Sequence, residues 1–191
     1  MTRSQEQTVD DHELLRRIAA GDTTAVPILF DRHQLRIFRF IMRLIHNEAT
    51  AEDLTNEVFL EVWRSADRFQ GRSAVSTWML SIAHNKTVSL LRKRSESELD
   101  DGLASTIMDD ADTPEITVSK KDKSEQIRLC MDRLSSNHRE IIDLVYFHEK
   151  TIGDISKILG IPEGTVKTRM FHARKKLGEL LRSEGIDRGW P

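Results

Sequence analysis

The residues from 165 to 182 carry the side chains whose types and spacing best suit contact with nucleic acid. Six basic residues occur there against one acid, Glu179. Cationic and hydrogen-bonding groups near the start of a helix suit the major groove of DNA, where base edges present donors and acceptors. The predicted base contacts are Lys167, Thr168, Phe171 and His172. The predicted phosphate contacts, which add affinity without sequence information, are Arg169, Arg174, Lys175 and Lys176.

Residues 151–170 have the spacing of a helix-turn-helix. Small Ser156 allows two helices to approach, Gly160 supplies the turn conformation, and Val166 packs the second helix on the first. Pro162 ends the first helix and can begin the second. A basic helix packed on its own domain, with a solvated outer face, is the alternative interpretation. The turn spacing, the basic surplus and a large apolar side chain at Phe171 together favour DNA binding.

Two further regions of helical periodicity position this motif. Residues 11–94 are expected to form four helices, the second capped by Thr23 or Thr24 and the third opened by a capping box at Thr50. A break at 69–73 precedes the fourth helix, expected from about Ala74 to Arg94 with Trp78, Ile82 and Leu90 or Leu91 inward. Helices near 123–134 and 136–148 are expected to precede the helix-turn-helix.

The stretch between these regions is acidic and lacks periodicity. Eight Asp and Glu residues and no Lys or Arg lie between Ser95 and Glu115, which predicts a flexible linker. The fold class is therefore all-α, with two small helical domains joined by a flexible acidic linker. The predicted boundaries are 1–94 for the first domain, 95–122 for the linker and 123–191 for the domain with the helix-turn-helix.

Composition limits the other classes of function. The chain of 191 residues has 38% hydrophobic and 31% charged residues, and a net charge of −2 that hides a basic C-terminal part and an acidic middle. We find no apolar run of membrane-span length, no secretory signal and a single cysteine, Cys130, so we expect a cytoplasmic protein without membrane insertion. The seven histidines lack ligand spacing, so neither a metal nor another cofactor is expected.

Five segments in order resemble the extracytoplasmic-function (ECF) sigma factors of bacterial RNA polymerase. They are 18–22 (IAAGD), 29–33 (LFDRH), 51–63 (AEDLTNEVFLEVW), 76–86 (STWMLSIAHNK) and 160–169 (GIPEGTVKTR). The resemblance implies that the first domain binds core RNA polymerase and the −10 promoter element, and that the second reads the −35 element. It also implies restraint by an anti-sigma factor, and a linker that enters polymerase near the template and RNA path or is only a spacer.

The resemblance assigns two further sets of residues. The surface for core polymerase is implied on one side of the third helix, where family members usually carry Gln at the position of Asn56; its residues are Asp53, Asn56, Glu57 and Glu61. The −10 segment is implied to hold a base turned out of the duplex among short polar groups and cations. Its residues are Gly71, Arg72, Ser73, Ser76, Thr77, Asn85 and Lys86.

Three other functions remain as alternatives. A dimeric helix-turn-helix regulator would explain residues 151–182 and leave the first domain unexplained. An enzyme is disfavoured because we find no nucleophile–base motif, phosphate loop or metal-ligand spacing, and no small-molecule substrate is expected. An adaptor that binds only proteins is disfavoured by the basic face at 165–182.

Overall fold

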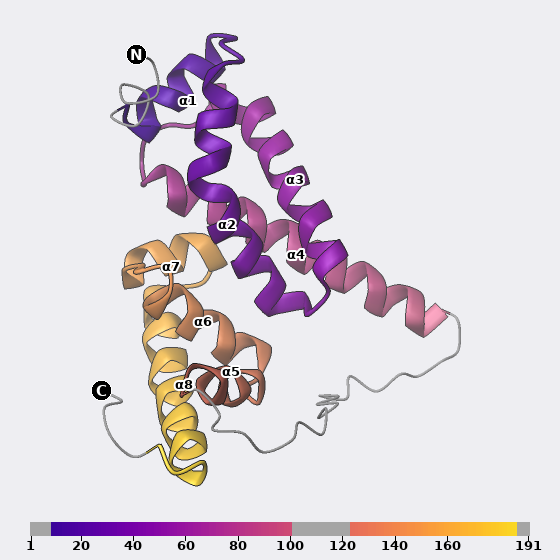
Figure 1. The fold of residues 1–191 in the computed structure, drawn as a ribbon, viewed down its shortest axis with the longest axis vertical. Coiled ribbons are helices and arrows are strands. Elements are labelled where there is room, and N and C mark those ends of the chain that lie inside the picture. The colour runs from indigo at the N-terminus through magenta and orange to yellow at the C-terminus, as the bar shows by residue number, and fades with distance from the viewer. Residues whose placement is uncertain (1–8, 101–122, 187–191) are drawn as a thin grey trace. The chain divides into compact units, whose positions relative to one another are not determined.

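The computed structural model describes residues 9–100 and 123–186, which form helices and turns; no strand occurs in these ranges (Figure 1). The first five elements are α1 (Asp11–Ala19), α2 (Ala25–Ile45), α3 (Glu48–Ser65), the short 3₁₀ helix η1 (Ala66–Arg68) and α4 (Val75–Asp100). The others are α5 (Lys123–Asp132), α6 (Ser136–Tyr146), α7 (Ile152–Leu159) and α8 (Glu163–Ser183). The predicted all-α class is confirmed. Most of the predicted linker lies outside the described residues.

Helices α1 to α4 form an N-terminal helical unit around one apolar core. On α1 the buried residues are Leu14, Leu15 and Ile18, and on α3 they are Leu54, Val58, Phe59 and Val62, in each case at helical spacing. On α2 the buried set is Ala25, Leu29, Ile37, Phe40 and Ile41. Burial of this apolar surface is the main source of the unit's stability, because no single short helix is stable in water on its own.

Two helix starts differ from the sequence prediction. Asn47, and not Thr50, caps α3: its side-chain Oδ1 accepts hydrogen bonds from the Thr50 backbone N–H at 2.9 Å and from the Thr50 hydroxyl at 2.7 Å. At α2, Thr24 holds the cap position, but Asp22 Oδ1 supplies the acceptor for its N–H at 2.9 Å. Asn47 thus pairs a backbone N–H of the first turn of α3, whereas Asp22 pairs the N–H of the α2 cap residue itself, and neither threonine hydroxyl caps a helix.

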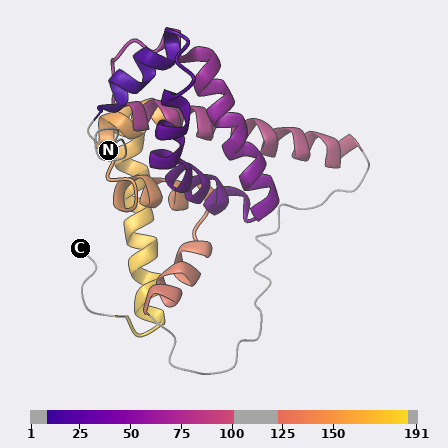
Figure 2. The ribbon, with the colours of Figure 1, turned by 45° about the horizontal axis from the view of Figure 1, so that its top comes forward.

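Helix α4 is longer than predicted and buries other residues. It runs through residues 95–100, past the expected end at Arg94, and its C-terminal half continues past α2 and α3 (Figures 1 and 2). Trp78, Ile82 and Leu90 are only half-buried and Leu91 is exposed. The buried apolar residues of α4 are Val75, Met79, Leu80 and Ala83. The predicted inward face of α4 is therefore not the one that is buried. The error arose because apolar residues lie on more than one face of this helix.

The C-terminal helical unit has its own core. Cys130, Met131 and Leu134 from the α5 region pack with Ile142 of α6 and with Ala173, Leu177, Leu180 and Leu181 of α8. The expected helices at 123–134 and 136–148 are confirmed to within about one turn. This core fixes the inward face of α8, so the residues between these positions must point outward.

Candidate nucleic-acid interface

The helix-turn-helix is present with the predicted turn. Gly160 has a φ of +64°, in the left-handed region that favours glycine, and Pro162 is the N-cap of α8. Val166 is fully buried, and so is Ile155 of α7. Thr151 caps α7, because its Oγ1 accepts from the Asp154 N–H at 3.1 Å while its hydroxyl donates to Asp154 Oδ2 at 2.7 Å. The motif is thus held by the turn at Gly160, the cap at Thr151 and apolar packing.

All four predicted base contacts lie exposed on α8. Lys167, Thr168 and His172 are exposed, and Phe171, at 65%, is the most exposed large apolar side chain of the described residues. The Phe171 and His172 rings meet edge to face with centroids 5.4 Å apart. The Thr168 hydroxyl donates to the Gly164 carbonyl at 3.0 Å, so towards a base it offers an acceptor and its methyl group. Four such groups on the outer face of α8 suit base edges.

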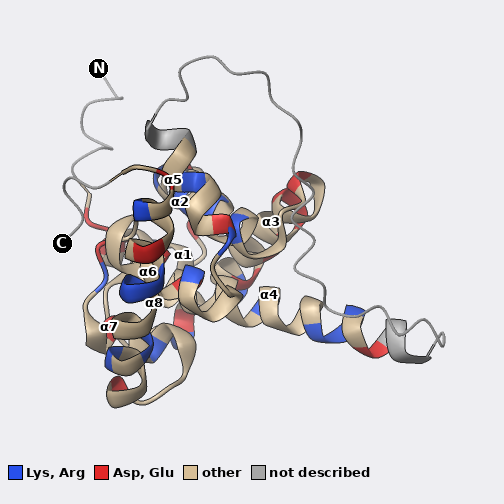
Figure 3. Cartoon of the chain, turned by 90° about the horizontal axis from the view of Figure 1, so that it is seen from below, with Lys and Arg blue, Asp and Glu red and all other residues tan. Residues whose placement is uncertain are grey.

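The predicted phosphate contacts differ in their surroundings. Lys175 and Lys176 are exposed, and Lys176 Nζ lies 3.9 Å from Glu179 Oε2. Arg169 and Arg174 are half-buried, and the Arg174 guanidinium lies 6.0 Å from the centre of the Tyr146 ring of the same unit. Lys and Arg recur along α8 (Figure 3). Lys175 and Lys176 are therefore the better presented cations, whereas Arg174 also stabilises its own unit.

The predicted −10 residues separate into two groups. Gly71, with φ +68°, and Arg72 are exposed in the loop before α4, and Ser73 and Ser76 beside them are half-buried. Thr77 is only 2% exposed, so its side chain lies in the core and is not presented at the surface, and its predicted −10 contact stays a prediction. Thr77 lies in the first turn of α4, within the helix that the sequence predicts from about Ala74.

Asn85 and Lys86 lie elsewhere, more than two turns along α4. With Ser89 and Lys93 they line a groove shared with Glu57 and Glu61 of α3. Lys86 Nζ lies 3.2 Å from Glu57 Oε2 in an ion pair with both partners partly exposed. The structure therefore brings predicted −10 residues beside two of the predicted polymerase contacts. An exposed pair of this kind contributes little stability and leaves both charges open to exchange partners.

The side of α3 that carries the predicted polymerase contacts is largely exposed. Asp53, Asn56 and Glu57 are exposed and Glu61 is half-buried. The same helix also exposes Leu60 (46%) and Trp63 (50%), which sequence reasoning missed. The helical period contained part of the signal: with Leu54, Val58 and Val62 inward, position 60 must face outward. Trp63 lies one turn after the buried Phe59, so its exposure depends on packing. Exposed Trp and Leu among acids are typical of a protein-binding surface.

Two further findings concern cofactors and membranes. In the described ranges, no group of three or more His, Cys, Asp or Glu side chains is arranged to hold a metal ion. None of the helices described here combines the length and hydropathy that crossing a bilayer requires.

The chain matches known proteins over most of its length. Residues 29–97 match the family model for Sigma-70 region 2, and residues 124–177 match that for Sigma-70, region 4. The chain is 31% identical over 177 residues to the ECF RNA polymerase sigma factor SigW of Bacillus subtilis, covering 88% of this chain and 95% of that protein. It is 27% identical over 185 residues to SigK of Mycobacterium tuberculosis H37Rv, covering 95% and 98%.

Solved structures agree with these matches. The sigma factor RpoE of Bartonella quintana, in complex with the anti-sigma factor NepR, aligns with a TM-score of 0.65 at 26% identity, covering 80% of this chain and 94% of RpoE. CnrH, in complex with the cytosolic domain of CnrY, has the same TM-score at 21% identity and covers 91% and 98%, which shows the shared fold. From both sigma-70 regions in order and the likeness to SigW, the chain belongs to the ECF RNA polymerase sigma factors, which direct RNA polymerase to promoters.

Proposed function

We propose that the chain reads a promoter with two separate surfaces while it is bound to core RNA polymerase. The loop around Gly71 and Arg72 would take the −10 element, and the outer face of α8 would read the −35 element. The observation that carries the proposal is the exposed set Lys167, Thr168, Phe171 and His172 on a helix whose other face is locked into a core. An exposed Phe171 suits contact with a thymine methyl better than contact with water.

The surface on α3 is proposed as the polymerase contact. Asp53 and Glu57 would pair with cations of the polymerase, and Leu60 and Trp63 would supply apolar contact area. Charged groups of this kind set orientation, and a Trp that becomes buried on binding is a typical anchor residue. The role is non-catalytic: the chain contributes binding energy and placement, and the polymerase performs nucleotide addition in the cytoplasm.

The proposed domains are 1–94 and 123–191, with 95–122 as the connection. A restraining anti-sigma factor is also proposed, because RpoE, 26% identical, was solved with one bound. Such an inhibitor would occupy the surfaces that polymerase and DNA need. The exposed Leu60 and Trp63 would be the natural apolar contacts for it.

Run-off transcription with purified core polymerase and genomic promoter fragments tests this function. We expect the chain to produce transcripts of defined length from a subset of fragments, and no transcripts without it. If the folded chain gives no promoter-specific initiation, the proposal fails. Specific binding of a duplex without polymerase, as a dimer, would instead support a stand-alone helix-turn-helix regulator.

A further inference from the structure

A second basic surface lies beside the predicted base-reading residues of the C-terminal helical unit. It is a groove of about 430 Å³ between α8 and the turn that leads from α5 into α6. One side is lined by His172, Lys175 and Lys176 of α8, and the other by Arg133, Ser135 and His138. His172 belongs both to this groove and to the predicted base-reading set. Arg133, Ser135 and His138 have no role in the function proposed above.

The charges of the groove favour an anion. Among the described residues that line it, three are permanent cations and one, Glu179, is a carboxylate. The internal partners are weak: Lys176 Nζ lies 3.9 Å from Glu179 Oε2, and Arg133 Nη1 lies 3.0 Å from Glu184 Oε1, with all four side chains about half exposed. Exposed ion pairs contribute at most about 1 kcal/mol, so a phosphate can displace the carboxylates from these cations.

The position of the groove identifies the source of the anion. His172, Lys175 and Glu179 follow at steps of three and four residues, so the groove runs along α8 directly from a predicted base reader. A helix that enters the major groove is bordered by the phosphates of both strands. We infer that this groove holds a backbone phosphate of the duplex that α8 reads, with Arg133, Ser135 and His138 as its contacts opposite α8. The inference rests on the proposed −35 reading by α8.

The proposed phosphate contact should make DNA affinity depend on pH through His138. His138 faces Arg133 from the preceding turn and Arg169, His172, Lys175, Lys176 and Glu179 from α8. Burial, and then the charges of His172 and Arg169, lower the pKa of His138. A phosphate in the groove would offset those charges and favour the protonated imidazole. Binding of DNA would therefore take up a proton at His138, and the affinity would rise as the pH falls towards 6.

Ethylation interference on a promoter duplex locates the contact directly. The experiment uses holoenzyme assembled from core polymerase and the full chain, with a promoter fragment selected by run-off transcription. With wild-type chain we expect interference at phosphates on both sides of the −35 element. With Arg133→Ala or His138→Gln we expect loss at one flanking phosphate, affinity about three- to tenfold lower, and a salt slope reduced by about 1 for the arginine variant.

Matched variants separate a phosphate contact from a structural role. Arg128→Ala removes an exposed arginine of α5 outside the groove and should leave the pattern unchanged. Glu184→Gln breaks the same ion pair as Arg133→Ala but leaves the cation available, so its affinity should be unchanged or higher. If Glu184→Gln weakens binding as much as Arg133→Ala, the ion pair matters only for folding and the inference is overturned.

The outcomes distinguish this inference from the proposed function. If wild-type holoenzyme gives no promoter-specific complex, the proposed function itself fails. If wild-type initiates and binds, but Arg133→Ala and His138→Gln keep every interference position and the pH dependence of wild-type, the groove takes no DNA phosphate. If His138→Gln flattens the rise in affinity between pH 8 and pH 6 and Arg128→Ala does not, the assignment of the proton is supported.

Discussion

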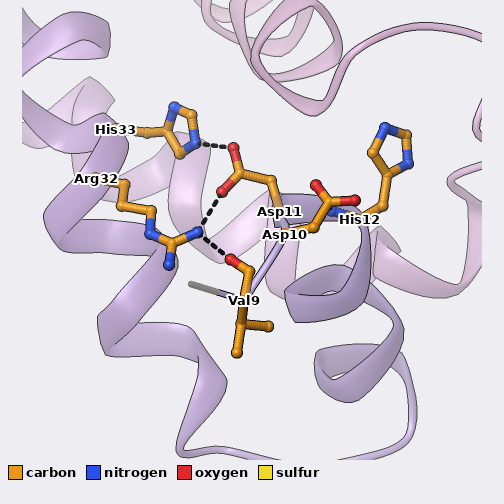
Figure 4. A network of polar contacts seen from close by, with 6 residues as sticks. All are labelled: Val9, Asp10, Asp11, His12, Arg32 and His33. Atoms are coloured by element: carbon orange, nitrogen blue, oxygen red, sulfur yellow. Dashed lines mark hydrogen bonds and ion pairs between the residues drawn. The ribbon is translucent and has the colours of Figure 1, made fainter. Parts of the chain in front are cut away.

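At the scale of single residues, Asp11 ties the start of α1 to α2 (Figure 4). Its Oδ2 lies 2.7 Å from His33 Nε2, and its Oδ1 accepts from Arg32 Nη1 at 2.9 Å. The hydrogen bond with His33, and then that with Arg32, hold the pKa of Asp11 below its usual value against the opposing effect of burial. A carboxyl whose pKa is lower in the folded state adds stability above its unfolded pKa and loses it as the pH falls.

Asp11→Asn is therefore expected to lower the free energy of unfolding at pH 7 by about 1–3 kcal/mol, because the nearly buried His33 loses a charged partner. Urea titration followed by the fluorescence of Trp63 and Trp78 would measure it. The difference between variant and wild type should shrink as the pH falls through the native pKa of Asp11, below 3.8. Asp31→Asn, an exposed carboxylate of α2, is the control. A difference that is constant down to low pH would show that the ionised carboxylate is not the cause.

Substitutions at Phe171 and Lys176 should affect DNA affinity in different ways. Phe171→Ala is expected to cost about tenfold in affinity for the preferred −35 sequence and little for others, since it removes a base contact. Lys176→Ala is expected to weaken all sequences similarly and to reduce the salt slope by about 1. Competition binding of holoenzyme with matched and mismatched duplexes at several salt concentrations separates the two. Equal losses on both duplexes for Phe171→Ala would exclude it as a base reader.

At the scale of elements, the turn between α7 and α8 depends on one glycine. At Gly160, φ +64° penalises any side chain, although no atom lies within 4 Å of an added Cβ. Gly160→Ala should cost about 1 kcal/mol and raise the opening frequency of the unit about fivefold. Cys130 reports this opening, because it is 1% exposed against α8 and burial raises the pKa of its thiol.

The measurement is the rate of thiol labelling by a disulfide reagent under native conditions. Gly178→Ala, inside α8 with open space around the added Cβ, should instead slow labelling, because alanine favours helix over glycine by about 0.5–1 kcal/mol. Faster labelling in both variants would mean that the positive φ of Gly160 is not the cause of the effect.

The buried face of a helix could be predicted where its apolar residues define a single face. Helix α1 places its large apolar residues on one side only, and α8 has a fixed turn before it, so their buried faces followed from the helical period. On α3 the period gave the buried stripe, but the exposed Leu60 and Trp63 lie outside it. Helix α4 has apolar residues on several sides, and only packing decides that Met79 and Ala83 are buried while Val88 is 47% exposed. The cap of α3 was also mispredicted, because Asn47 and Thr50 are both residue types that favour a helix N-cap, and the structure has Asn47.

At the scale of the whole molecule, the predicted sites lie in two helical units with separate cores. The residues of each α-helical face could be predicted, since they depend on spacing within one helix. The grouping of faces could not: the groove that joins Lys86 to Glu57 and the groove that joins His138 to His172 each unite two helices. Which faces meet is decided by how the helices pack. The local sequence pattern does not contain that information.

If polymerase and promoter bind to separate surfaces, substitutions in the two surfaces should lower the binding free energies independently. Trp63→Ala should raise the Kd for core polymerase by about tenfold or more, since a half-exposed Trp that becomes buried is a typical anchor residue. Its transcription defect should vanish at saturating core polymerase, whereas the defect of Phe171→Ala should persist there. At limiting polymerase the two free-energy losses should add, because the residues belong to different units. Leu129→Ala, with similar exposure on α5, is the control. Losses in the double variant well below the sum would mean that one surface acts through the other, since a molecule that reads polymerase and promoter independently must lose both energies.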